Sequence, residues 1–142
     1  MKSLFLICSL LLAPCSLLAE KVTLSRAQAS ELYVALASAE AGFAPANTIA
    51  AADNLNTLRP HVEALDKGKQ SYQRSVRALL KAQPADAELQ VEKLNAQLEA
   101  KADEELKLDL APLTLTDDEL TAAKVKPAQL AIIRQHLLPK KK

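Results

Sequence analysis

The sequence is poor in the residues on which many catalytic and binding motifs depend. Its 142 residues include two glycines, two cysteines, two histidines and no tryptophan, and aromatic residues make up 3% of the chain. Phosphate-binding loops need several glycines, and this chain has two. No GxSxG, HExxH, P-loop or GxGxxG motif occurs. The composition therefore excludes these motif-based activities, and it also excludes collagen-like and disulfide-rich folds.

An excess of charge of one sign is also missing. The chain carries 18 basic and 17 acidic residues, for a net charge of +1, and 49% of its residues are hydrophobic. A nearly neutral chain lacks the basic excess that is typical of nucleic-acid-binding domains. The hydrophobic fraction is too high for a chain that is disordered throughout, and the length fits one domain. We therefore expect a folded protein without a nucleic-acid partner.

Residues 1–19 have the pattern of a secretory signal peptide. Lys2 precedes an apolar run that Pro14 interrupts, and Ala19 stands just before the charged Glu20. Leu17 occupies a position where a small residue is usual. The segment is shorter than the about 20 apolar residues of a membrane-spanning helix, so we expect no stable membrane span after cleavage. The predicted organisation is a signal peptide at 1–19, a single helical domain at 20–139 and a basic tail at 140–142, located in the periplasm or outside the cell.

Both cysteines, Cys8 and Cys15, lie in this leader. Cleavage after Ala19 leaves a chain without a disulfide, a thiolate nucleophile or a cysteine metal ligand. Two alternatives stay open. Cys15 could be lipidated, although Pro14 precedes it where such signals prefer a small residue, and translation from a non-AUG codon near Val22 would give a cytoplasmic protein.

Two helices are predicted before residue 83. Ser25 and Gln28 have the spacing of a capping box, which predicts a helix over about 25–41 that ends near Gly42. Asn47 is a suitable cap for the second helix. That helix carries apolar positions at alternating spacings of three and four, an a/d heptad seam, and Pro60 within it predicts a kink. The seam positions are Thr48, Ala51, Leu55, Leu58, Val62, Leu65, Lys69, Tyr72, Val76 and Leu79.

The short link Gln83-Pro84 predicts that a third helix returns antiparallel to the second, because two long amphipathic helices joined so closely form a hairpin. Residues 59–81 contain six basic and two acidic side chains, whereas residues 85–119 contain eleven acidic and three basic ones. We expect these opposite charges to pair across the hairpin, at a few tenths of a kcal/mol for each exposed pair.

Residues 105–110 alternate polar and apolar side chains, which predicts a short half-buried strand. No second strand is evident, so we expect this segment to pair with another copy or a partner, or to lie as extended chain against the hairpin. Thr116 and Glu119 form a second capping box, and Pro127 opens a last helix at 127–138. The predicted fold is mainly α: an antiparallel helical hairpin or small bundle with a kinked long helix and one short extended segment near 105–110.

The histidines and acidic clusters are the candidates for catalysis or metal binding, but their spacing favours structural or solvent-exposed roles. His61 and His136 stand 75 positions apart, and neither has a second histidine or a cysteine at metal-ligand spacing. The acidic clusters at 103–105 and 117–119 lack the spacing of a calcium loop, and capping explains the second. We therefore predict no catalytic, cofactor-binding or metal-binding residues and no cofactor. The predicted partner-binding residues are Leu106, Leu108 and Leu110 of the extended segment and Leu58, Val62 and Leu65 of the seam.

The segments 32–36, 54–64, 104–110 and 127–130 (LYVAL, NLNTLRPHVEA, EELKLDL and PAQL) resemble a group of short uncharacterised proteins from tailed-phage and prophage gene sets. The resemblance covers most of residues 23–138 and implies no catalytic residues. Members of that group generally begin near the equivalent of Val22. The first functional hypothesis is an exported, non-enzymatic helical interaction or structural protein that binds a protein partner or itself. The alternative is a phage-derived intracellular assembly or accessory protein with a misassigned start.

Overall fold

The computed structural model describes residues 19–39 and 42–138, so the predicted leader up to residue 18 and the basic tail lie outside the described residues. The prediction of a mainly α fold is confirmed: five helices and a two-stranded antiparallel sheet make up the described part of the chain. In chain order the elements are β1 (Glu20–Ser25), α1 (Arg26–Ala39), α2 (Pro45–Ala82), α3 (Ala87–Asp103), β2 (Glu105–Leu110), α4 (Asp117–Ala122) and α5 (Pro127–Leu137). No described helix has the length and apolarity that crossing a membrane requires.

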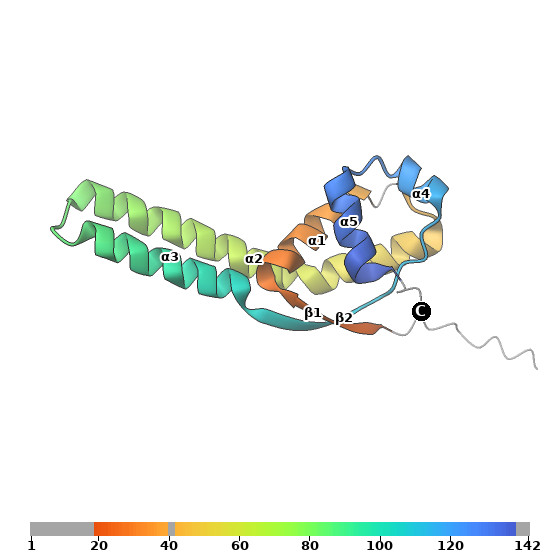
Figure 1. The fold of residues 1–142 in the computed structure, drawn as a ribbon, viewed down its shortest axis with the longest axis horizontal. Coiled ribbons are helices and arrows are strands. Elements are labelled where there is room, and N and C mark those ends of the chain that lie inside the picture. The colour runs from red at the N-terminus through yellow and green to blue at the C-terminus, as the bar shows by residue number, and fades with distance from the viewer. Residues whose placement is uncertain (1–18, 40–41, 139–142) are drawn as a thin grey trace, which may run out of the picture.

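The molecule consists of a compact head and a long arm (Figure 1). The head contains β1, β2, α1, α4, α5 and the first half of α2. The arm, which we define as residues 66–103, is the antiparallel pair formed by the second half of α2 and by α3, and it projects away from the head. The last fully buried residue of α2 is Leu65, and α3 has no buried residue. The predicted helical hairpin is therefore present, but the head alone contains the core.

Helix α2 runs through both parts without interruption. Leu58 and Leu65 of the heptad seam are buried in the head, whereas Tyr72, Val76 and Leu79 are half-buried in the arm. Pro60 lies inside the helix and does not break it. Proline has no N–H, so the carbonyl of Asn56, four residues before Pro60, lacks its helical hydrogen bond. Both residues are exposed, so water can hydrate this carbonyl.

The extended segment β2 has a partner within the same chain. β1 pairs with β2 in antiparallel register, with Leu24 opposite Leu106 and Glu20 opposite Leu110. The expectation that residues 105–110 lack an internal partner strand is therefore wrong. The apolar residues of β2 face the core of the head: Leu106, Leu108 and Leu110 are 7%, 7% and 1% exposed.

The predicted capping box at the start of α1 is confirmed. The backbone N–H of Ser25 donates to Gln28 Oε1 at 2.8 Å, and the N–H of Gln28 donates to Ser25 Oγ at 3.2 Å. Helix α1 is the central element of the head, because Leu32, Ala35 and Leu36 are completely buried against α2 and α5. It begins at Arg26, directly after β1, one residue later than predicted, and its predicted end near residue 41 lies outside the described residues.

Two asparagines of α2 hold the chain that follows β2. The Asn54 amide donates to the carbonyl of Ala111 at 2.8 Å and accepts from its N–H at 2.7 Å. Asn47, one heptad earlier, contacts Thr114 in the same way at 2.9 and 3.0 Å. We call these four hydrogen bonds the asparagine clasp. Asn47 is therefore not the cap of α2, which begins at Pro45 after Ala44.

Glu119 links the start of α4 to the start of α2. Its Oε1 accepts from the N–H of Ala44 at 2.7 Å and from the Asn47 amide at 2.8 Å, while Oε2 accepts from the N–H of Thr116 at 2.9 Å. These donors lower the pKa of Glu119 from 4.5 to about 2, with the Thr116 backbone making the largest contribution. The predicted capping box of Thr116 and Glu119 is confirmed, and its carboxylate also organises the head.

Candidate interaction site in the helical arm

Most of the predicted partner-binding side chains are part of the chain's own core. Leu58 and Leu65 are 0% and 2% exposed, and the three leucines of β2 are buried in the same core cluster as Leu58. Val62 is half-buried. In this fold five of the six predicted side chains already have packing neighbours, so they do not form a docking surface. The reason is that β1 and α1 cover apolar positions that looked unpartnered in the sequence.

The two histidines and the two acidic clusters, the candidates for catalysis or metal binding, do not come together in one site. His61 lies in α2 and His136 in α5, both half-buried. In the cluster at 103–105, Glu104 pairs with Arg26 at 2.8 Å. In the cluster at 117–119, Glu119 accepts the bonds described above, and its two acidic neighbours are exposed. Within residues 19–39 and 42–138, no group of three or more His, Cys, Asp or Glu side chains has a metal-binding arrangement.

The arm carries a surface groove that was not predicted from the sequence. It lies between α2 and α3 and consists of two connected hollows that share Leu94 and Gln97. The hollow nearer the head has a volume of about 180 Å³, and the one nearer the tip has a volume of about 530 Å³. We call this surface the arm groove; its lining residues are Gly68, Ser71, Tyr72, Ser75, Ala78, Leu79, Ala82, Gln90, Lys93, Leu94, Gln97, Leu98 and Lys101.

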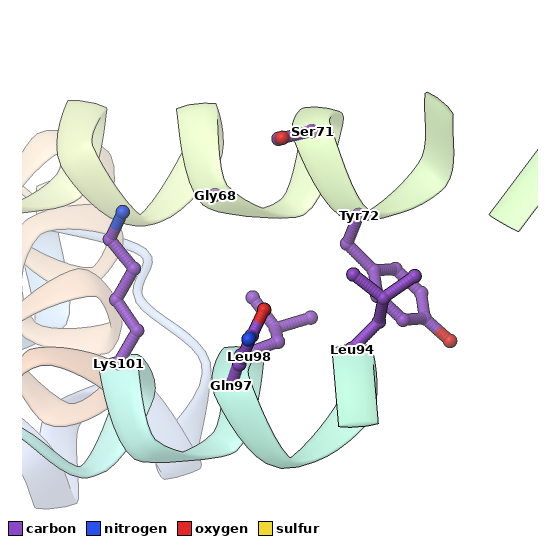
Figure 2. A pocket seen from close by; sticks show the side chains of 7 residues that line it. All are labelled: Gly68, Ser71, Tyr72, Leu94, Gln97, Leu98 and Lys101. Carbon is purple, nitrogen blue, oxygen red and sulfur yellow. The ribbon is translucent and has the colours of Figure 1, made fainter. Parts of the chain in front are cut away.

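Figure 2 shows the hollow nearer the head. The Tyr72 ring points from α2 towards α3 beside Leu94, and Leu98 points from α3 into the space between the two helices. The Lys101 side chain extends from α3 towards α2 at Gly68. A Cβ atom placed on Gly68 would lie 3.2 Å from Lys101 Cδ, so the missing side chain makes room for the lysine stem. The half-buried Tyr72, Leu94 and Leu98 thus hold the two helices together.

On the α2 side, the groove is lined mainly by small side chains. Ser71, Ser75, Ala78 and Ala82 recur at spacings of four, three and four, which places them on one helix face with Gly68. Small side chains let another backbone approach closely, and leucines on α3 supply apolar surface beside them. This shape suits a third helix packed along the pair. The repeated small residues next to the seam are the signal from which the groove could have been found in the sequence.

The charges of the arm do not pair as expected. The ion pairs among the described residues are Arg26–Glu104 at 2.8 Å and Asp66–Lys69 at 3.9 Å, and neither joins α2 to α3. The predicted charge pairing across the hairpin is therefore wrong. The side chains that face between the helices are largely apolar, so the charged ones point towards the two open faces of the arm.

Acidic and basic side chains of α3 lie on different faces. Lys93 and Lys101 line the arm groove. Glu88 and Glu92 line a separate hollow on the opposite face, together with Leu80 and Val91, with a volume of about 310 Å³. The α3 side of the groove is consequently basic, while Glu88 and Glu92 lie on the opposite face.

Comparisons with known proteins supply no relative from which a role could be transferred. No family model, no curated protein and no solved structure matches this chain.

Proposed function

We propose that this chain is an exported, non-enzymatic interaction protein that binds a protein partner along its helical arm. The observation that carries the proposal is the contrast between the two parts of the fold. The head has a continuous buried core, whereas the arm projects from it with no buried side chain in α3 and with an apolar groove along one face. We therefore propose the arm, and not the seam and β2 residues named from the sequence, as the partner-binding surface.

Exposed apolar side chains near the tip favour this role. Leu89 is 51% exposed, and Leu80, which lines the hollow on the face opposite the groove, is 65% exposed, so the arm carries exposed apolar surface outside the groove as well. Full burial of a leucine contributes about 1.5–3 kcal/mol relative to exposure. Helix α3 has no buried side chain, and helices in proteins are stabilised mainly by tertiary packing, so a partner packed along α3 would also stabilise the arm.

Export is supported by the leader pattern and by the position of β1. The first residue of β1 is Glu20, the residue that follows the predicted cleavage position. A chain that started at Val22 would lose two of the six β1–β2 residue pairs, those of Glu20 with Leu110 and Lys21 with Asp109. This loss disfavours the phage-derived intracellular alternative, in which translation begins near Val22.

The first experiment determines the compartment. The full chain with its native leader is expressed in a Gram-negative host, the cells are fractionated, and the intact mass of the protein is measured. A periplasmic product that begins at Glu20 is expected. A cytoplasmic product that begins near Val22 would overturn export and would support the intracellular alternative.

The second experiment tests the arm in intact cells of the native source. A photo-crosslinking amino acid replaces Ala78 in the groove or, as a matched control, Ala131 on the exposed face of α5; both alanines are exposed. We expect a discrete protein adduct from position 78 and none from position 131. Equal labelling from both positions, or no adduct from position 78, would contradict binding through the arm.

A further inference from the structure

Charge distinguishes the arm groove from the rest of the arm. Lys93 and Lys101 line it on the α3 side. On the α2 side, Lys67, Arg74 and Lys81 are exposed and directly precede the lining residues Gly68, Ser75 and Ala82. Lys67 and Arg74 each lie one turn before a lining residue, Ser71 and Ala78, and the spacing of seven puts Lys81 on the same line, along the outer side of α2 next to the groove. The groove therefore combines small and apolar side chains with serines and glutamines, is most apolar nearer the tip, and has cations along both of its helices.

Carboxylates are almost missing from this face of the described arm. Glu88 and Glu92 line the opposite hollow; Glu99 follows Glu92 by seven residues and Asp103 follows Glu99 by four, so both lie on that side of α3. Asp66, at the base of the arm, pairs with Lys69. Asp86 at the tip is the exception, and its Oδ1 accepts a hydrogen bond from the groove residue Gln90 at 2.9 Å. The cations that border the groove thus have no ion-pair partner in the arm.

We propose that the arm groove binds an amphipathic helix of a partner protein whose apolar stripe is flanked by Asp and Glu. This inference rests on the proposed function and names the chemistry of the partner. The apolar stripe would pack against the small residues of α2 and the leucines of α3, completing a three-helix bundle. The flanking carboxylates would meet Arg74 and Lys81 on one side and Lys93 and Lys101 on the other.

The same charges disfavour a second copy in this groove. In a two-fold dimer through the groove face, the cations of one copy would meet the cations of the other, because this face carries five basic side chains and one carboxylate. Like charges facing each other oppose association. A partner with acidic flanks is favoured for the same reason.

The test uses two synthetic helical peptides of about 17 residues, the length of α3. They share one leucine stripe and carry either glutamate or lysine at the flanking positions. Binding to the chain that begins at Glu20 is measured by fluorescence anisotropy at low salt. The glutamate peptide is expected to bind and the lysine peptide is not, and higher salt is expected to weaken the complex.

Three variants test the groove itself. The double reversal Arg74→Glu with Lys93→Glu should lower the affinity for the glutamate peptide about tenfold and favour the lysine peptide, because two exposed ion pairs become repulsive. Arg77→Glu makes the same kind of charge change on α2 outside the groove and should have less than about a twofold effect. Ala78→Arg adds a cation but fills the groove, so it should abolish binding.

Several results would overturn the proposal. Equal binding of both peptides, or stronger binding after Ala78→Arg, would mean that the groove does not hold a helix. A dimer in analytical ultracentrifugation that Ala78→Arg dissociates would assign the groove to a second copy. Sedimentation with phosphatidylglycerol vesicles that the same variant abolishes would assign it to lipid. If the peptides fail but the in-cell adduct at position 78 persists, the acidic helix is excluded and the interaction role remains.

Discussion

Replacing Asn54 with alanine removes half of the asparagine clasp without changing the surface of the molecule. The Asn54 side chain is 1% exposed and makes two hydrogen bonds to Ala111, at 2.7 and 2.8 Å. Alanine leaves both the N–H and the carbonyl of Ala111 without these partners. Each buried polar group left unsatisfied costs about 1–3 kcal/mol, so we expect the free energy of unfolding to fall by about 2–4 kcal/mol.

The assay is urea or guanidinium unfolding of the chain that begins at Glu20, followed by circular dichroism. Asn56→Ala is the matched control, because Asn56 is exposed on the same helix two residues away. Its effect should stay within about 0.5 kcal/mol of zero. Hydrogen exchange of the Ala111 amide should speed up in the Asn54 variant.

A loss of stability below about 1 kcal/mol in Asn54→Ala, or equal losses in both variants, would show that the clasp does not stabilise the head. Such a result would mean that residues 111–114 are held by apolar contacts, for example those of the fully buried Leu113. An unchanged exchange rate at Ala111 in a destabilised variant would lead to the same conclusion.

Three further predictions concern the two glycines and Glu119. Gly68→Ala should raise the free energy of unfolding by up to about 1 kcal/mol, since alanine is the better helix former and the flexible Lys101 can move aside; denaturant unfolding measures this. Gly42→Ala should lower it by about 1–3 kcal/mol in the same assay, because the new Cβ would overlap the backbone at the end of α4. The folded-state pKa of Glu119 is lowered from 4.5 to about 2, so its contribution to stability is complete above pH 4.5 and is lost as the pH falls towards 2. The melting temperature of Glu119→Gln should therefore lie below that of the original chain at pH 7 and converge with it near pH 2; a constant difference would contradict this linkage.

Local patterns in the sequence predicted local structure well. The capping boxes that begin at Ser25 and Thr116 both form, and the alternation at 105–110 is a strand. Each of these signals depends on residues within one or two turns of chain. The hairpin was also predictable from local information, because two long helices that are joined by a short link, here residues 83–86, pack antiparallel.

Contacts between distant parts of the chain were harder to predict. β1 has only Val22 and Leu24 as inward positions, too few to define an alternation, and its partner follows some 80 residues later. Asn47 was predicted to be an N-cap and Asn54 was given no structural role, whereas both side chains bond to residues far along the chain, Thr114 and Ala111. A clue was present: both asparagines share the helix face of the buried Leu58. A polar residue on a buried stripe needs a partner, but the sequence does not show which one.

The two helices of the arm are attached to the head at separate points. The Asn54 end of α2 is held by the clasp, and Ala78 in the groove lies 24 residues further along the same helix, ~36 Å at the standard rise. Helix α3 is anchored separately: the N–H of Arg26 donates to the Glu104 carbonyl at 3.0 Å, and the Arg26 guanidinium pairs with the Glu104 carboxylate. A helix bound in the groove would therefore lie along a hairpin that is attached to the head through both of its helices.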